Sequence, residues 1–227
     1  ALFIDESQLN LLQAQMAERG FLDASQMAGA FTWLRSYDLL WQRMVQEYLL
    51  GERSRGMDLM AWNADSTRMP ARMHTEYLSQ MFLHNDLARG RYLVGGRPVV
   101  LNDLKIPVYA VGTESDHVAP WKSVYKIHLL TDTEVTFVLT KGGHNAGIVS
   151  EPGRPRRHYR VATRPAFGNF KTTEEWVQDA ELHQGSWWEN WHAWLDKNSG
   201  AQQATPAMGS KDYPALEDAP GLYVMER

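Results

Sequence analysis

The chain has 227 residues, 44% of them hydrophobic and 22% charged, and its net charge at pH 7 is −4. This composition is typical of a globular protein with one substantial core, and the weak negative charge gives no reason to expect a nucleic-acid partner. No apolar run approaches the roughly 20 residues that a transmembrane segment needs. The chain has no cysteine, which excludes disulfides and cysteine-ligated metal within it. It begins without Met, directly in a helical pattern, and we expect it to be cut from a longer protein.

The first 90 residues carry the apolar spacing of amphipathic helices. A helix is predicted from Asp5, a potential cap, to Gly20, and others in "DASQMAGAFTWLR" (23–35), "DLLWQRMVQEYLLG" (38–51) and "ARMHTEYLSQMFLHNDLARG" (71–90). The stretch "MDLMAWNADSTRMP" (57–70) is too broken by Asn, Asp, Ser and Pro to be one element. In the helix over 38–51, Leu40, Met44 and Val45 would share one apolar face. This part of the chain is therefore expected to be mainly helical.

The pattern changes after residue 90. "RYLVGGRPVVL" (91–101) alternates around a Gly-Gly pair and predicts a hairpin. "IPVYAVGT" (106–113) and "EVTFVLT" (134–140) are short apolar runs typical of strands buried on both faces, and "APWKSVYKIHLL" (119–130) between them predicts a helix. Strand, helix and strand in this order predict a βαβ unit with parallel strands.

The last part of the chain mixes basic, helical and polar stretches. "EPGRPRRHYRVATRP" (151–165) predicts no regular element, and its arginines could bind the phosphates of a coenzyme, although a solvated loop is the favoured interpretation. Helices are predicted in "TTEEWVQDAELHQ" (172–184) and "GSWWENWHAWLDK" (185–197). The tryptophans of the second share one face, which we expect to pack on the sheet rather than to bind a polymer surface. Residues 199–210 predict a flexible linker.

An acid and a histidine follow the two predicted parallel strands. Asp116 lies just past the first strand and His144 just past the second, so both are expected at the same edge of the sheet. Gly142 and Gly143 would let the histidine's loop turn sharply. A carboxylate that orients an imidazole is the arrangement that activates a nucleophile, and α/β-hydrolases carry nucleophile, acid and histidine in that order. The alternative is a capping Asp and an ordinary loop His.

The nucleophile that such a pair would serve is absent from the chain. No G-x-S-x-G stretch lies upstream of Asp116, and there is no cysteine. If the pair is catalytic, the nucleophile must lie on sequence outside these 227 residues.

Several motifs resemble one family over residues 1 to 225. They are "YLLG", "DLMAWNADSTRMP", "FLHNDLARG", "GTESDHVAPW", "FVLTKGGHNAGIVSEP", "HQGSWWENWHAWL" and "APGLYV". Together they resemble the C-terminal half of class I polyhydroxyalkanoate synthases, acyltransferases that polymerise (R)-3-hydroxyacyl-CoA into a storage polyester. The tryptophan cluster and the D-H-x-x-P-W box are the most specific of these motifs.

The resemblance implies a covalent mechanism. Asp116 matches the family's catalytic aspartate and His144 its catalytic histidine, while the family's cysteine nucleophile would lie upstream of Ala1. The cysteine would attack the thioester of a substrate such as 3-hydroxybutyryl-CoA, so coenzyme A takes part as a substrate and no other cofactor is expected. We expect the isolated chain to be inactive, because loss of a nucleophile typically lowers turnover on the order of 10⁶-fold.

Three further residues match positions of the family's substrate region. His117 would lie near the active-site entrance, although it could be a polar residue at a helix start. Asn85 would lie near the catalytic pocket, although an Asn near a helix end is often a cap. Trp62 would contact substrate, although a buried Trp is more often part of the core.

The resemblance also predicts the fold class and the organisation of the chain. We expect an α/β-hydrolase-type fold that comprises the C-terminal part of the parallel sheet and an N-terminal, mainly helical cap or lid. Residues 1–102 would form the cap with its hairpin, residues 103–198 the core, and residues 199–227 a linker and tail.

The family further implies the partners and the cellular location. A homodimer through the cap and a place at the surface of the polyester granule in the cytoplasm are expected, with the growing polyester chain as a further partner. No metal is expected, since the eight histidines form no H-x-x-x-H or H-E-x-x-H pair.

Two other kinds of protein are compatible with the same residues. One is a related serine or cysteine hydrolase, such as an intracellular esterase or polyester depolymerase, that uses the pair with water. The other is a non-catalytic, granule-associated binding subunit.

Overall fold

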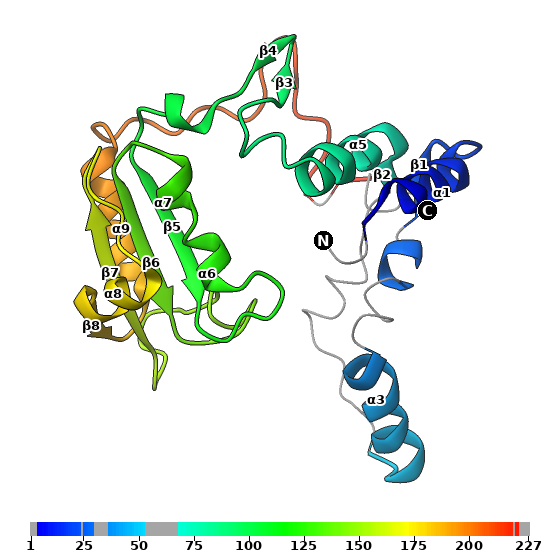
Figure 1. Ribbon diagram of the computed structural model, residues 1–227, viewed down its shortest axis with the longest axis horizontal. Coiled ribbons are helices and arrows are strands. Elements are labelled where there is room, and N and C mark those ends of the chain that lie inside the picture. Colours follow the sequence, from blue (N-terminus) through cyan, green and yellow to red (C-terminus); the bar gives the residue numbers. More distant parts are fainter. Residues whose placement is uncertain (1–3, 24, 30–35, 53–67, 220, 223–227) are drawn as a thin grey trace. The chain divides into compact units, whose positions relative to one another are not determined.

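The structure is a computed structural model that describes residues 4–23, 25–29, 36–52, 68–219 and 221–222 (Figure 1). The chain divides into two compact units, one formed by Ala1–Asp86 with Pro206–Arg227 and the other by Leu87–Thr205. The predicted hairpin thus lies in the unit that contains the large sheet. The predicted division into a cap, a core and a tail stays a prediction.

The first unit is mainly helical, as expected. Its elements are α1 (Glu6–Met16), β1 (Phe21–Leu22), η1 (Tyr37–Trp41), α3 (Gln42–Met44), η2 (Val45–Leu49), β2 (Met69–Pro70), α5 (Ala71–Glu76) and η3 (Tyr77–Leu83). Asp5 caps α1, because its carboxylate accepts a hydrogen bond of 2.8 Å from the N–H of Gln8. The buried side chains of Leu9 and Met16 lie on α1. In the described parts of the chain, no helix is long and apolar enough to cross a membrane.

Two of the predicted helices differ from expectation in detail. The helix over 38–51 is present as η1, α3 and η2 in succession, but Leu40, Met44 and Val45 on its predicted apolar face are each more than 40% exposed. The helix predicted over 71–90 ends at Leu83. It stops there because Asn85 adopts a left-handed conformation with φ of 53°, which cannot continue a helix.

The second unit contains the hairpin and a four-stranded sheet. Its elements are β3 (Leu93–Val94), β4 (Arg97–Pro98), η4 (Leu101–Asp103), β5 (Val108–Thr113), α6 (Trp121–Val124), α7 (Ile127–Leu130), β6 (Val135–Thr140), β7 (His158–Arg164), α8 (Thr173–Asp179), β8 (Glu181–Gln184) and α9 (Trp187–Asn198). The strand order is β5-β6-β7-β8. Strands β5 and β6 are parallel, with Thr113 opposite Thr140, so the predicted βαβ unit is confirmed. The α/β class is confirmed as well.

The sheet is mixed, which corrects the prediction of a parallel sheet. β7 pairs antiparallel with β6, and β8 pairs antiparallel with β7. β7 lies in the basic stretch for which no element was expected. β8 occupies the end of the helix predicted over 172–184: Thr172 starts that helix with a capping box, as expected, but the backbone becomes extended at Ala180. Pairing with β7 therefore overrides the helical pattern of residues 181–184.

Hydrophobic clusters cover both faces of the sheet, and all six residues of β6 are therefore buried. Phe137 and Leu139 belong to one cluster, which α6, α7 and α8 cover together with Tyr125 and Trp176. The alternate residue Val138 belongs to the other cluster, with Tyr159 and with Trp187 of α9 (Figure 1). The prediction that the tryptophan face packs on the sheet is confirmed for Trp187, whereas Trp191 is 40% exposed.

Candidate active site

The parallel strands β5 and β6 bring the acid and the histidine together. β5 ends at Thr113 and is followed by the turn that carries Asp116; β6 ends at Thr140 and is followed by the loop that carries His144. The Nδ1 atom of His144 lies 2.9 Å from Oδ2 of Asp116. The two turns are also joined by backbone, since the N–H of Ser115 donates to the carbonyl of Gly142 at 2.9 Å. The predicted proximity of the acid and the histidine is confirmed.

Backbone donors and burial hold the carboxylate of Asp116 in place. Its Oδ1 accepts hydrogen bonds from the N–H groups of Val118 at 2.9 Å and Ala119 at 2.8 Å, and its side chain is 7% exposed. Burial raises the pKa of this carboxyl, but the backbone hydrogen bonds and the imidazole outweigh it and hold the pKa below its ordinary value. The group is therefore ionised at neutral pH. Asp116 organises its own turn as well as the histidine.

The ionised carboxylate determines which nitrogen of His144 carries the proton. A carboxylate can only accept, so Nδ1 of His144 must donate to Oδ2 of Asp116. In the neutral imidazole, Nε2 is then the acceptor, which is the state that a general base requires. The His144 side chain is 47% exposed, so a reacting group can approach it.

Two glycines are required by the shape of the loop around His144. Gly142 has φ of 130°, and a Cβ there would lie 2.7 Å from Cα of Gly147. A Cβ on Gly147 would lie 2.5 Å from Cγ2 of Thr113, at the end of β5. Gly143 is less restricted, because the nearest heavy atom to an added Cβ would be 3.8 Å away. Gly142 was predicted on this ground, whereas Gly147 was not, because it follows Ala146 in a stretch without any local signal.

For the other three predicted site residues, the structure gives a position at most and no contact with a substrate. The exposed side chain of His117 lies on the same turn as Asp116. Asn85 belongs to the other unit, where its left-handed backbone ends a helix, as the capping interpretation requires. Trp62 lies outside the described residues. The roles of these three residues in substrate binding stay predictions.

The sequence holds no G-x-S-x-G stretch that could supply a nucleophile to the pair of Asp116 and His144. The sequence has no cysteine, and the described residues include no group of three His, Asp or Glu side chains that could hold a metal ion. The arrangement can orient an imidazole and stabilise its protonated form, and it can accept a proton from a nucleophile supplied by another segment.

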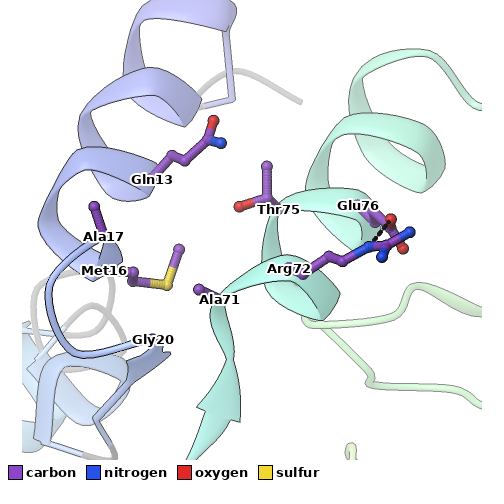
Figure 2. A pocket seen from close by; sticks show the side chains of 8 residues that line it. All are labelled: Gln13, Met16, Ala17, Gly20, Ala71, Arg72, Thr75 and Glu76. Atoms are coloured by element: carbon purple, nitrogen blue, oxygen red, sulfur yellow. Dashed lines mark hydrogen bonds and ion pairs between the residues drawn. The ribbon is translucent and has the colours of Figure 1, made fainter.

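A groove of about 410 Å³ lies in the other unit, between α1 and α5 (Figure 2). It is lined by Gln13, Met16, Ala17, Gly20, Ala71, Arg72, Thr75 and Glu76. The Arg72 Nε atom forms an ion pair of 2.8 Å with Oε1 of Glu76 (Figure 2). None of the predicted site residues that the structure describes lines this groove, so we assign the chemistry to the acid and the histidine.

These features define an α/β protein with an acid–histidine pair of the kind that activates a nucleophile. The chain is 41% identical over its full 227 residues to the poly(3-hydroxyalkanoate) polymerase subunit PhaC of Rhizobium etli, of which it covers 35%. It is 40% identical over 224 residues to the poly(3-hydroxyalkanoate) polymerase of Methylorubrum extorquens, of which it covers 36%. It is also 35% identical over 231 residues to the PhaC subunit of Cupriavidus necator, of which it covers 38%.

The predicted resemblance to polyhydroxyalkanoate synthases is confirmed: along its whole length, the chain is similar to a segment of poly(3-hydroxyalkanoate) polymerases. It spans between 35% and 40% of the length of the curated relatives that it matches. None of the protein-family models matches the chain.

Proposed function

We propose that this chain is the acid- and histidine-bearing part of an acyltransferase that polymerises (R)-3-hydroxyacyl-CoA, such as 3-hydroxybutyryl-CoA, into polyhydroxyalkanoate with release of CoA. The 2.9 Å pair of Asp116 and His144 carries the proposal, because it is the part of a catalytic triad that this segment would supply. The names of the relatives supply the polymer, and the acyl-CoA substrate follows from the family resemblance.

The proposed chemistry has two transfer steps at a cysteine upstream of Ala1. In the first, Nε2 of His144 accepts the thiol proton, the thiolate attacks the acyl-CoA carbonyl, and the expelled CoA sulfur takes the proton back. In the second, the 3-hydroxyl of another hydroxyacyl group gives its proton to the imidazole and attacks the enzyme thioester. An ester forms and the cysteine leaves with the returned proton.

The contacts of Asp116 support an orienting role for this residue. The family resemblance implies that it both orients His144 and activates the attacking hydroxyl. Its Oδ1 already accepts two backbone hydrogen bonds, its Oδ2 faces the imidazole, and its side chain is 7% exposed. Little of the carboxylate is left for a substrate hydroxyl, so we assign proton transfer to His144 and orientation to Asp116.

The open edge of the sheet supports the proposed position of the cysteine. β5 is the first strand of the sheet and pairs only with β6 among the described strands. Its other edge presents backbone donors and acceptors to which a further parallel strand can bond. A strand there would end at the same edge as Asp116 and His144, where a nucleophile is needed. The α/β-hydrolase-type fold is proposed on this ground.

The remaining predictions on the whole protein are part of the proposal. A helical cap would exclude water from the thioester and so favour transfer to a hydroxyl over hydrolysis. CoA thioester is the substrate, and no separate cofactor is required by this chemistry. A homodimer through the cap, and a location at the granule surface in the cytoplasm, follow from the family resemblance alone.

The test begins with the coding sequence upstream of Ala1 and the longer protein that it encodes. We expect an in-frame segment with a cysteine in a G-x-C-x-G elbow, and the longer protein should release CoA and form polymer from 3-hydroxybutyryl-CoA. His144→Gln should abolish both activities, and the 227-residue chain alone should release no CoA. A serine elbow with free 3-hydroxy acid as the product would instead establish a hydrolase. An upstream segment without a nucleophile would refute catalysis.

A further inference from the structure

The loop that carries His144 is held by side chains from later parts of the chain. This histidine loop, residues 141–150, connects the end of β6 to the segment that leads into β7. Its residues form turns and bends without regular secondary structure. The position of the imidazole therefore depends on whatever fixes the carbonyls of the loop.

Arg157 donates to both sides of His144 within this loop. Its Nη1 donates to the carbonyl of Lys141 at 2.9 Å, and its Nη2 donates to the carbonyl of Ala146 at 2.8 Å. Arg157 directly precedes β7, and its neighbour His158 accepts a backbone hydrogen bond of 3.0 Å from Lys141. The guanidinium thus connects the two ends of the segment that contains the histidine, and its own backbone is held in place by the adjoining strand β7.

Other donors fix the second half of the histidine loop. The indole N–H of Trp187 donates to the carbonyl of Gly147 at 3.2 Å, and that of Trp188 donates to the carbonyl of Ile148 at 2.9 Å. The hydroxyl of Ser186 donates to the carbonyl of Ser150. All three donors come from the start of α9. The half of the loop after residue 146 is thus held independently of Arg157. Around the histidine, the N–H of Ser115 binds the carbonyl of Gly142, and Arg157 is the side chain that binds carbonyls on both flanks.

We propose that Arg157 is a positioning residue that fixes the imidazole of His144 for proton transfer, an inference that rests on the proposed function. The guanidinium presents its two Nη atoms in a rigid planar fork, whereas the ammonium of lysine is a single donor atom on a flexible stem, so we expect lysine to hold the two carbonyls less firmly. A displacement of about 1 Å at a reacting group can lower a rate on the order of 100-fold. The proposal gives this arginine of the basic stretch a role in the loop instead of a role in binding CoA phosphates.

The first experiment measures amide hydrogen exchange in the 227-residue chain. Arg157→Lys is compared with Arg156→Lys, a matched control at the adjacent exposed arginine. We expect exchange of the loop amides over 142–147 to become at least about tenfold faster in Arg157→Lys and to stay unchanged in the control. The amides of β6 should exchange equally slowly in all forms, which shows that the sheet is folded. Unchanged loop exchange in Arg157→Lys would overturn the proposal.

The second experiment measures kinetics in the longer, cysteine-bearing protein. Arg157→Lys and Arg157→Gln should lower kcat by about 10- to 100-fold and leave KM for 3-hydroxybutyryl-CoA unchanged, because the substrate's binding groups are intact. Arg156→Lys should match wild type. A raised KM with unchanged kcat would overturn the proposal and assign Arg157 to substrate binding. An inactive wild-type protein would refute the proposed function, whereas the exchange result would still decide whether Arg157 holds the loop.

Discussion

Replacing Asp116 by Asn removes a charge and changes almost no volume, and the surrounding contacts determine how the new amide lies. The Oδ1 atom accepts two backbone hydrogen bonds, from Val118 at 2.9 Å and from Ala119 at 2.8 Å. An amide NH₂ cannot accept, so the oxygen of the Asn must stay at this position. The NH₂ group is then forced to face Nδ1 of His144, where Oδ2 of the acid now lies at 2.9 Å.

The expected consequence is the wrong tautomer of His144. Nδ1 must accept from the new NH₂ group, so the proton moves to Nε2, and Nε2 can no longer accept a proton from a nucleophile. In serine proteases the equivalent change of acid to amide lowers kcat by about 10⁴-fold with the geometry intact. Since each factor of ten is about 1.4 kcal/mol, the expected loss of transition-state stabilisation is about 5.5 kcal/mol.

Two measurements check this prediction on the Asp116→Asn variant. In the 227-residue chain, the ¹⁵N shifts of the imidazole report the tautomer, and the two nitrogens of His144 should exchange their roles. In the longer protein, rapid-mixing assays separate the burst of CoA release from chain elongation, and both should slow together. The matched control is Glu114→Gln, which removes an acid that pairs at 3.1 Å with a different imidazole, that of His158. It should leave kcat within about threefold, because a partly exposed pair contributes little.

A fast burst without elongation in the Asp116→Asn variant would refute the reasoning, because it would place the carboxylate on the attacking hydroxyl. An unchanged tautomer of His144 would refute the inference that the new amide moves the imidazole proton to Nε2.

Three further predictions concern stability. Gly147→Ala should lower the free energy of unfolding, measured by urea titration, by about 1–3 kcal/mol, because the added Cβ would lie 2.5 Å from Cγ2 of Thr113 in β5. The control Gly143→Ala should have a much smaller effect, since the nearest heavy atom there would be 3.8 Å away. Folding lowers the pKa of Asp116, so its carboxylate contributes fully to stability above the ordinary pKa of 3.8, and this contribution is lost as the pH falls through the pKa of the folded state. The difference in free energy of unfolding between wild type and Asp116→Asn should therefore shrink below pH 3.8. Arg164→Met should lower the free energy of unfolding by about 3 kcal/mol, because its guanidinium donates to three backbone carbonyls and a buried imidazole, whereas Arg156→Met should change it by less than about 0.5 kcal/mol.

The part of the fold that the sequence predicts is the part that positions the site. The apolar runs of β5 and β6 identify strands, and the short helical stretch between them makes the strands parallel. β6 is buried along its whole length, as expected, whereas the first four residues of β5 are only half-buried. Because the strands are parallel and neighbouring, Asp116 and His144, which follow their ends, lie at the same edge of the sheet. The tautomer also follows, once the acid is known to be ionised. The local pattern was sufficient here because burial on both faces leaves an unmistakable composition.

The errors occur where long-range pairing overrides the local pattern. β7 carries alternating basic residues between prolines and was taken for a loop, and β8 contains residues that are compatible with a helix. Their antiparallel pairing is visible only in space. The contacts of Arg157, Trp187 and Trp188 with the histidine loop were also missed, because they join residues up to 40 positions apart. No periodicity or motif in the sequence records such contacts.

Arg157, Trp187 and Trp188 follow the histidine in the sequence, and this order determines when the bonds of the histidine loop can form during synthesis. A ribosome synthesises Asp116 and His144 before Arg157, and all three before the indoles of Trp187 and Trp188, so the acid–histidine pair leaves the exit tunnel ahead of the guanidinium and the indoles that hold the loop. A nascent chain that stops before α9 would contain the complete acid–histidine pair and still lack the bonds to Gly147 and Ile148. The loop thus acquires its full set of these bonds only when the start of α9 has been translated, 40 residues after the carbonyls that the indoles bind.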